Sequence, residues 1–97
     1  MATYVWLLNW TDQGIRNLKE TTKRAKSFQE MAEKKGVKVK EILWTMGRYD
    51  LVLVIDAPND ETISSLTLGV GMSGNVKQET LKAFSVQEME QILKGLP

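Results

Sequence analysis

The side chains best suited to chemistry in this sequence are Arg48, Tyr49 and Asp50, which follow one another near the middle of the chain. Asp50 stands at the beginning of an apolar segment, where burial would raise its pKa toward the range in which a carboxylate acts as a general base. Arg48 or Tyr49 would then orient an oxygen-bearing ligand while Asp50 moves a proton. The same residues also fit a hydrogen-bonded brace, in which Asp50 pairs with one of them or with a strand neighbour such as Asn9 or Thr80.

Three tryptophans form the second candidate set. Large aromatic side chains commonly fill cores and interfaces, which is one interpretation of their presence here. The other is that they line a pocket between a sheet and its helices, suited to a flat, mostly apolar small molecule. The candidate ligand-binding residues are therefore Trp6, Trp10, Trp44, Arg48 and Tyr49, and the candidate catalytic residue is Asp50.

The chain contains neither histidine nor cysteine. This excludes Cys/His zinc sites, thiol nucleophiles, disulfides and the histidine base of hydrolase triads. Asp56, Asp60 and Glu61 do not have the spacing of a calcium loop, because Pro58 stands at a ligand position. We therefore expect neither a metal nor an organic cofactor.

The glycines of residues 69–74 fit the pattern G-x-G-x-x-G. In a dinucleotide-binding fingerprint these glycines follow a strand and open a helix. Here a helix precedes them and a strand follows, so the segment is predicted to be a helix-to-strand turn. The alternative is that exposed amides of this turn contact a ligand.

Alternating apolar residues predict strands at about 3–10, 37–44, 49–56 and 76–84. A long helix is predicted from Thr11 or Asp12 to near Gly36, and a second helix from Pro58 to the glycines of 69–74. A capping box at residues 85–88 predicts a short terminal helix. The apolar residues that this last helix should turn inward are Met89, Ile92, Leu93 and Leu96.

This order, βαββαβ plus a terminal helix, predicts one α+β domain over residues 1–97 with the ferredoxin-like fold. Its four-stranded antiparallel sheet has the strand order 4-1-3-2, with the helices on one face. The strands at 3–10 and 49–56 are apolar on both faces, and a short terminal helix cannot cover a four-stranded sheet. We therefore expect a homodimer in which two sheets pack face to face.

An RNA-binding protein of the same topology would display aromatic residues on its third strand. Here that strand is aliphatic after Tyr49, and the formal net charge is only +1, so we expect no nucleic-acid partner. Basic residues concentrate between Arg16 and Lys40, which is typical of a solvated helix face. We also expect a cytoplasmic protein without a membrane partner, since no apolar run approaches the ~20 residues of a membrane span.

The segment from Met46 to Val54 resembles the GYD-domain family of small prokaryotic proteins, as do Asp56-Ala57-Pro58, Gly74-Asn75-Val76 and the segment from Glu79 to Phe84. Arg48 separates Gly47 from Tyr49-Asp50, which departs from the Gly-Tyr-Asp motif of that family. The resemblance covers nearly the whole chain and implies a subunit of the dimeric α/β-barrel type. It implies no activity, because the family has no established biochemical function.

The sequence thus favours a homo-oligomeric protein that binds a small, largely apolar molecule without a cofactor. Two alternatives remain open. One is a cofactor-independent monooxygenase or isomerase with Asp50 as its base. The other is a structural or regulatory assembly module that has no ligand.

Overall fold

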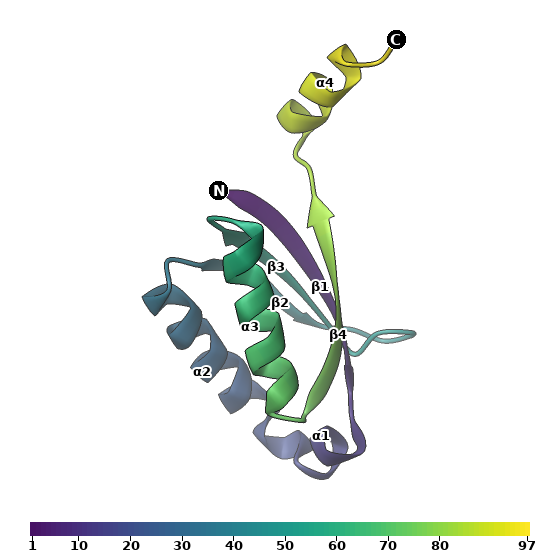
Figure 1. The fold of residues 1–97 in the computed structure, drawn as a ribbon. Coiled ribbons are helices and arrows are strands. Elements are labelled where there is room, and N and C mark those ends of the chain that lie inside the picture. The colour runs from purple at the N-terminus through teal and green to yellow at the C-terminus, as the bar shows by residue number, and fades with distance from the viewer.

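The computed structural model describes residues 1–97 and is built on one four-stranded antiparallel sheet with helices on one face (Figure 1). The strand order is β2-β3-β1-β4, which is the predicted order 4-1-3-2 read from the other edge. The elements in chain order are β1 (Ala2–Trp10), α1 (Asp12–Arg16), the 3₁₀ turn η1 (Leu18–Glu20), α2 (Thr21–Lys34), β2 (Lys38–Trp44), β3 (Leu51–Ala57), α3 (Asp60–Met72), β4 (Val76–Ala83) and α4 (Val86–Lys94).

The core lies between the sheet and α2 and α3. Alternate residues of the two central strands, β1 and β3, point into it because side chains of a strand alternate between its faces. The buried residues of these strands are Tyr4, Trp6, Leu8, Leu51, Leu53, Ile55 and Ala57, and the helices add Ala32, Ile63 and Leu66. The predicted ferredoxin-like architecture is therefore confirmed, and its core is concentrated on two strands.

The opposite face of the sheet is also apolar at its centre, and no element of the chain covers it. Val5 and Leu7 of β1 pair with Val54 and Val52 of β3, so all four side chains share this face. The edge strands continue the patch with Leu43 of β2 and Leu81 of β4, which are 50% and 41% exposed. We call these six residues, Val5, Leu7, Leu43, Val52, Val54 and Leu81, the open-face patch.

The prediction of one long helix from residue 12 to residue 36 is wrong, because the segment divides into α1, η1 and α2. Thr11 caps α1 as predicted, but hydrogen bonds from Thr11 and Gln13 tie α1 to the turn at residues 73–75. The chain must therefore leave α1 at Asn17 before it can run back along the sheet as α2. In consequence Ile15 and Leu18, two apolar residues of this segment, are 57% and 38% exposed.

Two other elements, β3 and α3, have boundaries that differ from the predicted ones. β3 begins at Leu51 rather than Tyr49, because residues 45–50 form the connection from β2. α3 continues through Gly69 and Gly71 to Met72, and the turn that follows uses Gly74 at φ +82°. This positive φ explains the need for glycine at position 74, since L side chains rarely adopt it.

α4 has the predicted capping box, in which the Ser85 side chain accepts from the Glu88 amide and the Glu88 carboxylate accepts from the Ser85 amide. The predicted inward orientation of its apolar residues is wrong for this chain on its own. Figure 1 shows α4 standing beyond the end of β4, away from the sheet and the other helices, and no residue of α4 is buried. None of the helices is both long and apolar enough to cross a membrane.

A buried phenol joins the sheet to the first turn of α3. The Tyr4 hydroxyl donates to an Asp60 carboxylate oxygen, to which Lys82 Nζ also donates at 3.4 Å. The hydrogen bond to Asp60, together with burial and the nearby negative charge, raises the pKa of Tyr4 to about 12. The same hydrogen bond, followed by the charge of Lys82, lowers the pKa of Asp60.

Gly14 of α1 provides a test of the contact between α1 and the turn at residues 73–75. A Cβ at Gly14 would lie 2.0 Å from the Asn75 carbonyl oxygen, whereas a Cβ at Gly71 would meet nothing within 4 Å. We expect Gly14→Ala to lower the free energy of unfolding by about 1–3 kcal/mol, because backbone must move to admit the methyl group. Gly71→Ala should instead raise it by about 0.5–1 kcal/mol, as expected for a helical glycine. Urea denaturation measures both, and equal effects would contradict the close approach.

The Tyr4–Asp60 contact predicts the pH dependence of stability. The fold favours the neutral phenol, so the stability that Tyr4 contributes is complete below the unfolded tyrosine pKa of about 10. This stability is lost as the pH rises through about 12. The lowered pKa of Asp60 contributes stability above the unfolded aspartate pKa of about 3.9, which is lost as the pH falls through the folded value.

Ultraviolet absorbance titration, with far-ultraviolet circular dichroism to confirm the fold, should show a tyrosine transition near pH 12. Tyr4→Phe should remove it, Tyr49→Phe should leave it, and Asp60→Asn should move it to lower pH. Persistence of the transition in Tyr4→Phe would contradict the assignment.

Candidate functional site

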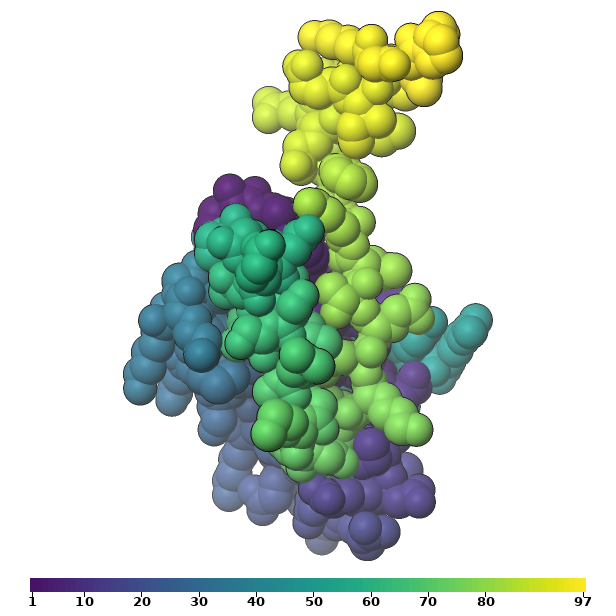
Figure 2. Space-filling model, in the orientation of Figure 1, coloured from purple at the N-terminus to yellow at the C-terminus, as the bar shows by residue number.

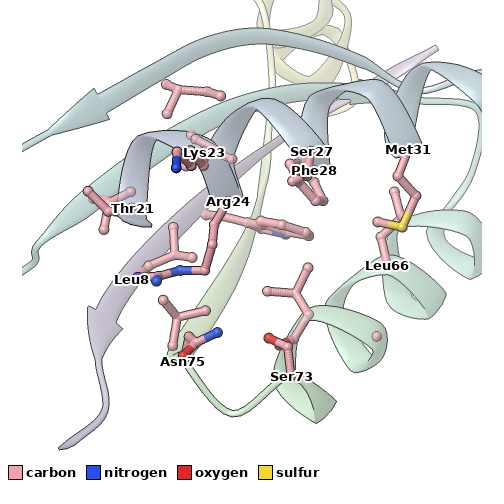
Figure 3. Close-up of a pocket in the computed structure, with 18 of the residues that line it drawn as sticks. Leu8, Thr21, Lys23, Arg24, Ser27, Phe28, Met31, Leu66, Ser73 and Asn75 are labelled. Atoms are coloured by element: carbon pink, nitrogen blue, oxygen red, sulfur yellow. The ribbon is translucent and has the colours of Figure 1, made fainter. Parts of the chain in front are cut away.

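A cavity of about 630 Å³ lies between the sheet and helices α2 and α3 (Figure 3). Its floor is formed by β1 and β3, and its sides by the facing surfaces of the two helices. The apolar residues that line it are Trp6, Leu8, Trp10, Ala25, Phe28, Met31, Ile42, Leu51, Leu53, Leu66, Val70 and Val76. This concave, mainly apolar surface is therefore the candidate binding site.

The cavity exists because the two helices cover different parts of the sheet. α2 packs on β2, whereas α3 packs on β3 and β4. The central strands between them are therefore only partly covered. The Phe28 ring of α2 reaches inward and packs against Trp6, with ring centroids 5.2 Å apart and a tilt of 42°.

The polar groups of the cavity lie mostly at its rim. Lys23, Arg24 and Lys35 contribute positive charge, and Glu20 pairs with Lys23 at 3.3 Å. Arg24 extends from α2 in the direction of Leu8 (Figure 3), and one of its guanidinium nitrogens donates to the Asn17 carbonyl oxygen at 2.7 Å. The rim therefore carries a net positive charge above an apolar interior.

Several buried donors beside the cavity have no acceptor. The second terminal nitrogen of Arg24 and the indole nitrogens of Trp6 and Trp10 are shielded from solvent and make no hydrogen bond. An unpaired buried donor destabilises a protein by about 1–3 kcal/mol. The wall beside the cavity therefore holds three donors whose burial is not compensated by a hydrogen bond.

The structure separates the predicted site residues into two groups. Trp6 and Trp10 line the cavity. Trp44 is 42% exposed and lies outside it, although its indole N–H donates to Oγ1 of Thr21, a residue of the cavity wall. Arg48, Tyr49 and Asp50 belong to the connection between β2 and β3 and do not line the cavity.

Asp50 braces the end of the sheet. Its carboxylate accepts from the Trp10 amide at 2.9 Å and from the Asn9 side chain at 3.4 Å, and its own amide donates to the Leu8 carbonyl at 2.8 Å. Asn9 is one of the partners considered from the sequence. The Arg48 guanidinium lies over the Tyr49 ring, 5.6 Å from its centroid. A catalytic role for Asp50 stays a prediction.

Of the residues that line the cavity, only Trp6 and Trp10 were identified from the sequence as site residues; those not identified include Arg24, Phe28, Met31 and Leu66. In the sequence, Phe28 and Leu66 stand at helical spacing from other apolar residues of the two predicted helices. The sequence indicates that an apolar side of each helix faces the sheet. It does not indicate how far apart the two helices lie on the sheet, because that distance is set by tertiary packing. No group of three or more acidic side chains is placed to hold a metal ion.

Comparison with known proteins agrees with this architecture. A curated protein of Thermus thermophilus, the "Glutamine synthetase and cystathionine beta-lyase binding protein", is 33% identical over 95 residues, which cover 97% of this chain and 100% of that protein. A crystal structure of a Thermus thermophilus protein superposes with a TM-score of 0.56 at 22% identity, covering 89% of this chain and 96% of the other, and it supports the fold alone.

The model of the GYD domain matches residues 4–93, from the first strand to the terminal helix. The match includes the β2–β3 connection, both cavity tryptophans and nearly all of α4. This protein therefore belongs to the GYD-domain family.

Proposed function

We propose that this protein is a homodimeric binding protein of the cytoplasm that holds a small, largely apolar molecule between its sheet and its helices. The observation that carries the proposal is the apolar cavity over β1 and β3. Its volume of about 630 Å³ lies within the ~300–1,000 Å³ typical of small-molecule sites. The apolar interior favours an apolar body, and the basic rim favours an oxygen-bearing end.

The proposed homodimer is supported by the open-face patch. Val5, Leu7, Val52 and Val54 lie at the centre of a sheet face that no part of the chain covers. A contiguous apolar surface on a sheet is a common site of association. Two copies packed face to face would bury these residues on both subunits at once.

The enzyme alternative with Asp50 as a base has less support. Asp50 does not line the cavity, and its carboxylate is already engaged by Trp10 and Asn9. A general base must lie within hydrogen-bond reach of the proton that it abstracts. Binding without chemistry is therefore the function that the geometry supports best.

The name of the Thermus relative favours a second candidate function. That protein is described as binding glutamine synthetase and cystathionine beta-lyase, and it matches this chain over its full length. We propose that this protein also binds metabolic enzymes, with a glutamine synthetase as the first candidate partner. The exposed apolar residues outside the cavity, such as Met46, Leu68 and Met72, are available for such contacts.

Two glycines of α3 allow a matched test of the cavity. Gly69 lines it and Gly71 does not, and a Cβ meets nothing within 4 Å at either position. The neutral fluorophore 1-aminoanthracene serves as the probe. We expect saturable binding with one site per chain in the wild type, at least tenfold weaker binding in Gly69→Phe because the ring fills the cavity, and unchanged binding in Gly71→Phe. Equal affinity in the two variants, or no saturable binding to the wild type, would contradict the cavity as a binding site.

The partner proposal predicts direct association with an enzyme. Purified glutamine synthetase from the source organism, titrated with this protein in a calorimeter, should show saturable binding with a Kd in the micromolar range or below. Cystathionine beta-lyase is the second enzyme to titrate, and an unrelated enzyme of similar size is the control. Absence of binding to both candidate enzymes would refute this function while leaving the cavity proposal intact.

A further inference from the structure

Helix α4 is an amphipathic helix without a packing partner. Figures 1 and 2 show it projecting beyond the body of the molecule, connected only through Phe84 and Ser85. Its apolar residues, together with Leu96 just beyond its end, recur at three- and four-residue intervals, so they form one stripe. The exposed fractions in this stripe are 77% for Val86, 45% for Met89, 43% for Ile92, 49% for Leu93 and 65% for Leu96.

Such a helix is not expected to be stable by itself. α4 has nine residues, whereas isolated helices shorter than ~12–15 residues are marginal in water. Its capping box contributes about 1 kcal/mol, which does not replace tertiary packing. The stripe therefore requires an apolar surface to pack against.

The dimensions of the chain show how much surface is left uncovered. Its accessible surface is 6726 Å², whereas a compact monomer of 11.0 kDa exposes about 5,600 Å². Its radius of gyration is 14.7 Å, against about 12.5 Å for a compact domain of 97 residues. The excess of about 1,100 Å² is similar to the ~800 Å² that each subunit buries in a stable interface of standard size.

The chain's own sheet is a poor partner for the stripe. α4 is about 14 Å long and about 10 Å wide. The open face of four strands is about 19 Å wide and more than about 20 Å long. Folding α4 back over this face would therefore leave most of the open-face patch in water.

We propose that α4 is an exchange arm that packs its stripe of Val86, Met89, Ile92, Leu93 and Leu96 against a second copy of this chain. The inference rests on the proposed homodimer and identifies the segment that completes it. α4 continues directly from β4, whose Leu81 belongs to the open-face patch, so the sheet contact and the arm contact form one continuous surface. In a dimer with two-fold symmetry, the rotation that relates the two copies places each α4 against the other copy, so both arms are buried together.

The test compares two substitutions on opposite sides of α4. Leu93→Asp places a charge in the stripe, and Gln91→Asp places the same charge on the polar side. Neither residue packs against the body, so the sheet and its helices should fold in both variants. Sedimentation equilibrium should give a dimer for the wild type and for Gln91→Asp, and a dimerisation constant at least tenfold weaker for Leu93→Asp. Hydrogen exchange should show amides of residues 89–94 protected in the wild-type dimer and exchanging freely in Leu93→Asp.

Any other outcome shows which claim is wrong, the arm contact or the homodimer. If Leu93→Asp dimerises as tightly as the wild type, the arm is refuted and the homodimer stands. If the wild type is a monomer with α4 protected, the arm folds back on its own chain, and both the arm and the homodimer are refuted. Leu81→Lys on the open face, with Thr80→Lys on the other face of β4 as its control, tests the sheet contact separately from the arm.

Discussion

The structure depends on the pairing of two strands, β1 and β3, that are apolar on both of their faces. Their antiparallel register places Tyr4, Trp6 and Leu8 beside Ile55, Leu53 and Leu51 on one face, and Val5 and Leu7 beside Val54 and Val52 on the other. A sheet can bury two faces only if a layer lies on each side. The chain supplies one layer of helices, and no part of it supplies the second. The proposed dimer would provide the missing layer.

The cavity follows from the same arrangement on the covered face. A sheet of four strands is about 19 Å wide, and helices α2 and α3 lie toward its two edges, so the centre is only partly filled. Large side chains of the central strands, above all Trp6, form the floor of the space that remains. The best-packed strands of this protein therefore also form the floor of its candidate binding site.

Much of the fold could be predicted from the sequence because it is encoded locally. The βαββαβ order identified β1 and β3 as central, in agreement with their apolar character on both faces, and the capping box at Ser85 located α4. The break in the first helix could not be predicted in this way, because it depends on hydrogen bonds between α1 and residues 73–75, about 60 positions away. The inward orientation expected for Leu93 failed for a related reason, since an apolar stripe shows that a partner is needed but not which chain supplies it.

The candidate site was predicted only in part, and the difference between the predicted and the missed residues has a physical cause. Trp6 and Trp10 were identified because large aromatic side chains fill cores or line pockets, and the same reasoning also selected Trp44, which lies outside the cavity. Arg24 and Phe28 were missed because their positions depend on where α2 crosses the sheet. Asp50 was correctly recognised as a residue that needs partners, and its hydrogen bonds to Trp10 and Asn9 account for that need.

The most direct test of the central claim measures whether the open face of the sheet is covered in solution. Methyl resonances of Val52 and Val54 can be compared with those of buried Leu53 and exposed Leu68 in the presence of a soluble paramagnetic agent. If a second copy covers this face, the relaxation enhancements of Val52 and Val54 will match that of Leu53. Enhancements close to that of Leu68 would show that the face is open to water and would contradict the claim.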